Sequence, residues 1–172
     1  GTVTAGDSVT LTVAAVVFVL WNAAPRSLLL GWLLSIAVLS LPAFIVVRRF
    51  TRAQRDVGMG TWRRALVVSY GLAGAGWGAA SFLLYPRVSM PYQLFLVFIL
   101  GGAGVSGMAA LASVRMAFIA YLTATFVPII AMLVASGRPA SMATAMLLLV
   151  FWGTTLSLAS YLRALMVRSL RL

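Results

Sequence analysis

The chain has 172 residues, of which 63% are hydrophobic and 9% charged, and its formal net charge is +11. Soluble domains carry about a quarter charged residues, so this composition excludes a water-soluble globular protein. Cys, His, Lys and Glu are missing, and the acidic residues are Asp7 and Asp56, which excludes disulfides and thiol catalysis. We therefore expect no metal, no cofactor and no catalytic residue in this chain.

Six apolar segments follow one another along the chain, and a helix needs about 20 such residues to cross about 30 Å of hydrocarbon. They cover residues 8–22, 28–47, 65–85, 92–113, 116–136 and 141–161, the first being short. Three breaks combine a helix breaker with a charge: Pro25-Arg26, Pro86-Arg87 and Gly137-Arg138. Arg115 alone divides the fourth segment from the fifth. The pattern predicts an all-α, polytopic membrane protein, a six-transmembrane-helix bundle in residues 1–161.

The 13 basic residues are all Arg and lie at the edges of the apolar segments, where positive charge indicates topology and not nucleic-acid binding. With six spans and a cytoplasmic N-terminus, ten fall on the cytoplasmic side: Arg48, Arg49, Arg52, Arg55, Arg63, Arg64, Arg115, Arg163, Arg168 and Arg171. Three fall outside: Arg26, Arg87 and Arg138. Because cytoplasmic loops carry the excess of Arg, we expect both termini in the cytoplasm and the lipid bilayer as a partner.

The polar connection at residues 48–64, RRFTRAQRDVGMGTWRR, holds the candidate residues for lipid headgroup contact. They are Arg48, Arg49, Arg52, Arg55, Arg63 and Arg64. An Arg near anionic headgroups gains about 1 kcal/mol. Two interpretations are open: a regulatory contact with lipid or a partner, and a solvated loop whose charge only sets the topology, which the positive-inside rule favours.

Glycines gather in the third segment, GLAGAGWGAAS, and in the fourth, GGAGVSGMAA. Gly74 and Gly78 form a G-x-x-x-G pair, and Gly102 and Ser106 belong to a stripe of small residues on the other segment. Small residues let helix backbones approach closely in lipid. We therefore expect the third and fourth helices to pack tightly together through these four residues. A ligand groove is the alternative.

Trp77, Gln93 and Thr125 are the candidate ligand-binding residues, because each places a polar group in or beside an apolar span. The N–H of Trp77 lies near mid-depth and needs an acceptor, and a buried amide such as that of Gln93 needs a partner. Thr125 is close to Pro128, and its hydroxyl is placed to satisfy a carbonyl that the proline frees. Ordinary burial with a backbone partner is the alternative for each.

The last apolar segment passes without a break into YLRALMVRSLRL. Its apolar residues there keep the three-to-four spacing of a helix that leads toward a coiled coil. We expect residues 162–172 to begin a cytoplasmic signalling helix. An output domain, absent from this chain, is expected to follow in a longer parent protein.

The basic loop ends in TWRRALVVSYGLAGAGWGAASFLLYP, and PYQLFLVFILGGAGVSGMAALAS and FIAYLTATFVPIIAMLVASGRP come next. Over residues 61–172 this order resembles the multi-helix N-terminal sensor regions of bacterial signalling proteins. Such regions precede diguanylate cyclase or phosphodiesterase domains, or histidine kinase domains. The resemblance implies a dimer in the bacterial inner membrane. The catalytic motifs of those families are missing here, so no catalytic residue is carried over.

The expected function is therefore a sensory and anchoring module of a signal-transduction protein. It would couple a membrane signal or a small apolar ligand, through the last helix, to a cytoplasmic cyclase or kinase domain. The alternative is a small six-helix membrane transporter made of two three-helix repeats. That alternative lacks visible repeats and ionisable coupling residues in the spans.

Overall fold

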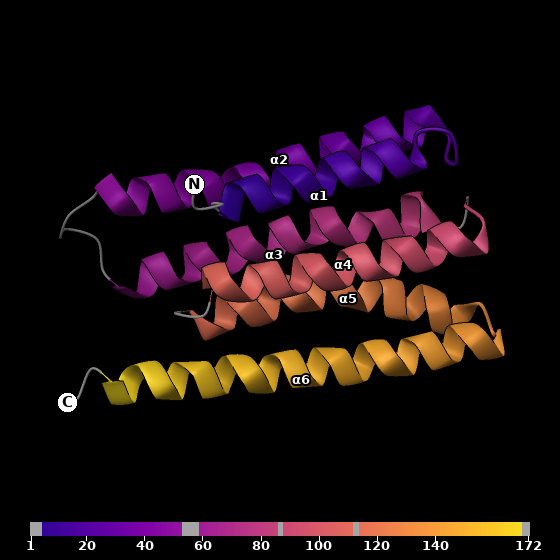
Figure 1. The fold of residues 1–172 in the computed structure, drawn as a ribbon. Helices are drawn as coiled ribbons and strands as arrows, with labels where there is room; N and C mark the ends of the chain where they lie inside the picture. The colour runs from indigo at the N-terminus through magenta and orange to yellow at the C-terminus, as the bar shows by residue number, and fades with distance from the viewer. Residues whose placement is uncertain (1–4, 53–58, 86–87, 112–113, 170–172) are drawn as a thin grey trace.

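The part of the chain that the structure describes folds into six helices, each antiparallel to the one before it (Figure 1). The structure is a computed structural model that describes residues 5–52, 59–85, 88–111 and 114–169. In chain order the helices are α1 (Ala5–Leu20), α2 (Arg26–Arg52), α3 (Met59–Leu83), α4 (Met90–Leu111), α5 (Arg115–Ala135) and α6 (Pro139–Ser169). The described part of the chain contains no strand, and the predicted all-α, six-helix architecture is confirmed.

Five of the helices, α2 to α6, are long and apolar enough to cross a membrane. α1 is shorter, because its 16 residues rise about 24 Å, against about 30 Å of hydrocarbon. Large apolar side chains cover the outer surface: Phe18 is 85% exposed, Phe98 79% and Met146 70%. A surface of this kind needs lipid around it, so the fold is that of a multi-pass membrane protein.

The helix ends follow local chemistry. α5 begins at Arg115, where the single-residue break was predicted. Pro139 opens α6, because its fixed φ suits the first turn and its missing N–H is not needed there. Gly137, with φ of 63°, makes the left-handed turn between α5 and α6. α2 and α6 extend beyond their predicted spans, to Arg52 and Ser169.

α3 and α5 form the centre of the bundle and share its most extensive helix contact. α2 packs on the far side of α3, and both α4 and α6 pack against α5, while α1 packs against α4 (Figure 1). The core contains large side chains that are almost wholly buried, among them Trp32, Phe118 and Phe126. Trp32 meets Trp77 edge to face, with ring centroids 6.0 Å apart. α6 therefore lies at the periphery of a core built on α3.

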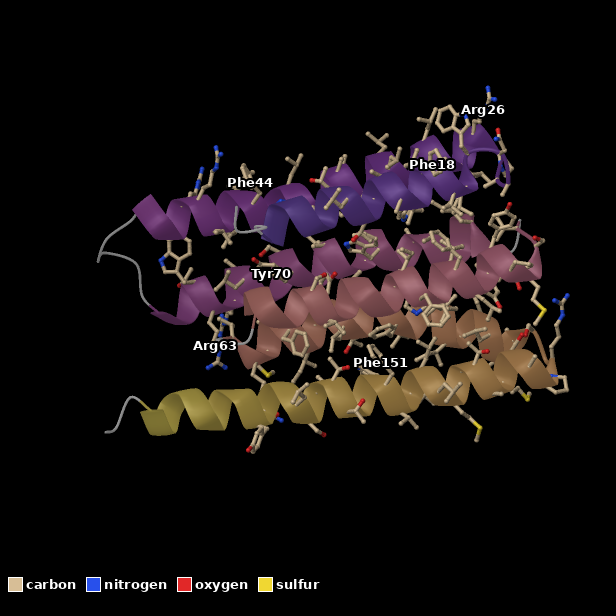
Figure 2. The ribbon with its side chains drawn as sticks, viewed as in Figure 1. Phe18, Arg26, Phe44, Arg63, Tyr70 and Phe151 are labelled. Atoms are coloured by element: carbon tan, nitrogen blue, oxygen red, sulfur yellow. The ribbon has the colours of Figure 1, made fainter. Side chains whose placement is uncertain are left out.

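Arg residues gather at one end of the bundle, where Figure 2 shows Arg63, and Arg26 lies at the other end. Eight described helix positions carry Arg at the first end: Arg48, Arg49, Arg52, Arg63, Arg64, Arg115, Arg163 and Arg168. Arg138 shares the second end with Arg26. Arg55, Arg87 and Arg171 fall outside the described residues. The described Arg residues assigned to one side from the sequence thus lie at the same end of the bundle. Which end faces the cytoplasm stays a prediction.

Candidate functional site

Two glycines bring α3 very close to α5. A Cβ atom at Gly74 would fall on the carbonyl oxygen of Tyr121. One at Gly78 would fall on the carbonyl oxygen of Ala124. Pro128 has no N–H to offer Ala124 four residues earlier, so this carbonyl lacks its helical donor and lies against Gly78. We call this contact the α3–α5 seam. It is made by Gly74, Gly78, Tyr121, Ala124, Thr125 and Pro128.

Thr125 ties together the two helices of the α3–α5 seam. Its side chain is fully buried, and its hydroxyl donates to the Tyr121 carbonyl at 2.9 Å within α5. The same oxygen lies 3.3 Å from the Gly74 carbonyl across the seam. We expected this hydroxyl to satisfy the carbonyl that Pro128 frees. It instead contacts carbonyls of both helices, one turn away from the proline.

The predicted packing of α3 against α4 through their small residues is wrong. Gly102 has no neighbour within 4 Å of a Cβ built there, and the Ser106 hydroxyl donates within α4 to the Ala103 carbonyl at 3.0 Å. Gly74 and Gly78 do lie at a tight helix contact, but with α5. The physical reason is that a small-residue stripe permits close approach without specifying the partner.

The glycines of α4 that do pack receive aromatic rings from α5. A Cβ at Gly104 would lie 2.9 Å from Cζ of Phe126, and one at Gly107 would lie 2.5 Å from Cε1 of Tyr121. The Tyr121 hydroxyl donates to the Ala103 carbonyl of α4 at 3.0 Å. The sequence analysis did not predict this hydrogen bond between α5 and α4. The available signal was a tyrosine deep in a span, whose O–H needs an acceptor.

The three candidate ligand-binding residues lie in three different contacts. Trp77 is buried against Trp32 of α2, and Thr125 is buried in the α3–α5 seam. The Gln93 amide donates to the carbonyls of Tyr85 and Val88, at 3.1 and 3.2 Å, and so fastens the α3–α4 connection to α4. Of the three, Gln93 also lines a cavity, which is described below. Ligand binding by these residues stays a prediction.

An open groove of about 460 Å³ runs between α4 and α6. Its walls are Leu94, Val97, Phe98, Gly101, Gly102, Val105, Thr144, Leu147, Leu148 and Phe151, and these residues define the α4–α6 groove. Gly101 and Gly102 leave the α4 wall hollow, because neither has a side chain to fill it. Phe151 reaches from α6 toward the core (Figure 2), where its ring meets Phe126 edge to face at 5.9 Å between centroids.

A smaller cavity of about 50 Å³ lies next to the α4–α6 groove, toward the end of the bundle that carries Arg138. It shares Leu94, Val97 and Thr144 with the groove. Its other lining residues are Tyr85, Met90, Gln93, Leu133, Arg138, Ala140 and Ser141. The two hollows thus lie next to each other along α4 and α6 and are together called the path, which has polar side chains, Gln93, Arg138 and Ser141, at one end and is apolar along most of its length. Sequence reasoning missed this path, because helically spaced Leu and Phe are also the pattern of an ordinary lipid-facing surface.

The candidate headgroup residues lie where the end of α2 meets the start of α3 (Figure 1). Arg48, Arg49, Arg63 and Arg64 are exposed, and Arg52 closes α2, while Arg55 is outside the described residues. The Arg48 guanidinium lies 4.2 Å from the ring centroid of Phe44, a cation–π contact at the membrane boundary. The four exposed Arg residues lie at one end of the bundle, and both their contact with lipid headgroups and a regulatory role stay predictions.

Comparison of the chain with protein-family models, with curated proteins and with solved structures finds no match.

Proposed function

We propose that this chain is a membrane-embedded sensory and anchoring module of a bacterial signal-transduction protein. In this proposal α6 carries a change in helix packing from the bundle to a cytoplasmic cyclase or kinase domain. The observation that supports it is the length of α6, which runs as one helix of 31 residues, or about 46 Å. Its apolar part ends at Leu158, and the helix continues past Arg163 and Arg168. A continuous helix transmits rotation or sliding as a rod.

The packing of α6 supports the same proposal. α6 rests mainly on α5 and touches α4 only lightly, whereas α3 and α5 are locked backbone to backbone in the seam. Met146 and Leu147 of α6 are each 70% exposed, and Val150 is 64% exposed. A peripheral helix with few partners can shift between two packings at a lower cost than a central one. A ligand that favours one packing would then shift the population.

The outward face of α6 is compatible with the proposed homodimer. Gly153 and Ser157 are exposed and four residues apart, and no neighbour lies within 4 Å of a Cβ built at Gly153. Small residues at this spacing permit a close helix–helix contact in lipid. In the proposed orientation both termini lie in the cytoplasm, and the Arg-rich end of the bundle faces the cytoplasmic leaflet of the inner membrane.

A register experiment tests the proposal. A diguanylate cyclase domain is fused behind Leu172 as a reporter, and one to four alanines are inserted after Tyr161. Because one residue turns a helix by about 100° and four turn it by about one full turn, cyclase activity should change most with one or two alanines and return with four. Two glycines at the same place should remove the dependence. Equal activity in all insertion variants would leave the bundle an anchor only.

A further inference from the structure

We infer that the α4–α6 groove binds one phospholipid from the leaflet at the Arg138 end, with the phosphate beside Arg138 and an acyl chain between α4 and α6. The inference names a ligand class for the proposed sensory module. Its consequence for α6 rests on that proposed function, whereas the binding itself does not.

The polar end of the path fits a phosphodiester. Arg138 is exposed at the start of α6, and its own carbonyl accepts from the Met142 N–H at 2.9 Å, so it caps the helix. The first N–H groups of α6 lack intrahelical acceptors and carry the positive end of the helix dipole. Of the two acidic residues, Asp7 lies in the first turn of α1, at the opposite end of the bundle, and Asp56 lies outside the described residues. Among the described residues no carboxylate lies at the Arg138 end, so an anion bound there would come from outside them.

The apolar part of the path fits an acyl chain. Arg138 and Phe151, its two ends on α6, are about 20 Å apart along the helix axis. One leaflet contributes about half of the 30 Å hydrocarbon core, and the headgroup region adds several ångströms to this. The path thus runs from the membrane boundary to mid-bilayer, which is the depth of one lipid. Its volume of about 460 Å³ lies within the range of ligand sites.

The shape of the α4–α6 groove favours lipid over a second copy of the chain. In a two-fold dimer the same patch meets itself. Two hollows do not fill each other, and the two copies of Arg138 would approach with like charge. A phospholipid supplies both a convex apolar chain and the missing anion. It would also bridge α4 and α6, which contact each other only lightly, and would so favour one position of α6.

The test uses the full chain in detergent micelles and a phosphatidylglycerol that carries a photoreactive diazirine in one acyl chain. Labelled residues are mapped by mass spectrometry, with unlabelled phosphatidylglycerol as competitor. We expect label on residues 94–105 of α4 and 144–151 of α6, and its displacement by the competitor. Gly102→Leu should fill the groove and reduce labelling about tenfold, and Leu147→Trp fills it from the other wall in case Gly102→Leu does not fold. Gly31→Leu, at an equally open and exposed glycine of α2, is the matched control and should leave labelling unchanged.

A second pair of variants tests the headgroup. Arg138→Gln should weaken competition by phosphatidylglycerol about fivefold, the size of one Arg contact at an anionic surface. Arg26→Gln, at the same end of the bundle, should not. The inference is overturned by even labelling around the outer helices, by equal effects of the two glycine variants, by cross-links between two copies at the groove, or by displacement of the label with inorganic phosphate or diacylglycerol as well as with phosphatidylglycerol. If the groove is labelled but cyclase activity of the fusion does not depend on the number of inserted alanines, the signalling proposal is wrong and the lipid site stands.

Discussion

The α3–α5 seam and the α4–α6 groove are both built on glycine, and glycine has opposite consequences in the two. At Gly78 the missing side chain is replaced by a carbonyl of another helix, whereas at Gly102 it is replaced by nothing from the protein. The first arrangement locks two backbones together, and the second leaves a hollow open to lipid. A small residue in a membrane helix therefore allows another helix to approach closely. Whether a contact or a cavity forms there depends on the helix that faces it.

The largest expected effect is at the α3–α5 seam. Gly78→Leu would place its Cβ on the Ala124 carbonyl oxygen and close to Cγ of Pro128, at 3.1 Å, so backbone must move. We expect the free energy of unfolding to fall by about 3 kcal/mol or more, measured by denaturant titration in mixed micelles. Gly31→Leu, at an exposed glycine of α2 with no neighbour within 4 Å of its Cβ position, is the control and should change it by less than about 0.5 kcal/mol. Equal losses for the two variants would contradict the seam.

A smaller effect is expected from the hydroxyl that crosses the seam. Thr125→Val keeps the shape of the side chain but removes the donor to Tyr121 and the contact with Gly74. The loss should be about 1 kcal/mol, the scale of an interhelical hydrogen bond in a membrane bundle. Thr154→Val removes an exposed hydroxyl that bonds only within α6, and should be nearly neutral. If Thr154→Val is as harmful, the contribution of Thr125 is local to its own helix.

The smallest effect is expected in the α4–α6 groove. Gly102→Ala adds a methyl group that meets no neighbour within 4 Å, so unfolding should change by less than about 0.5 kcal/mol. The same denaturant titration measures it. A loss comparable to that of Gly78→Leu would show that α4 packs against another helix at Gly102, as the sequence alone predicted, and would close the groove.

Helix number and helix breaks were predictable because they depend on local chemistry. Arg115 marks the start of α5 without help from proline or glycine, since a charge resists burial in hydrocarbon, and Pro139 suits the first turn of α6. Which helices pack against each other was not predictable in the same way. The Gly74 and Gly78 stripe indicates a close approach, but the carbonyl that Pro128 frees lies in α5, about fifty residues further along the chain. Only the tertiary arrangement brings them together.

The candidate ligand residues show the same limit. Each of Trp77, Gln93 and Thr125 was chosen because a polar group in a span needs a partner, and that requirement holds for all polar groups in lipid. Gln93 and Thr125 find backbone carbonyls, and Trp77 lies against a second indole. Apart from Thr144, the groove is lined by Leu, Val, Phe and Gly, which carry no polar signal. Its one charged neighbour, Arg138, was assigned to topology, and topology and ligand binding are not exclusive roles for an Arg at a helix end.

The short α1 has a consequence for the membrane around it. With 16 residues beside the 27 of α2, α1 is shorter than the hydrocarbon layer that its neighbours span. Lipids next to a short helix compress, or the helix ends draw headgroups inward, and either response costs a fraction of a kcal/mol per ångström of mismatch. The described part of α1 therefore matches a thinner hydrocarbon layer than α2 does. A thinner bilayer would reduce the mismatch at α1 and increase it at α2, so a change in bilayer thickness would act with opposite sign on the two helices.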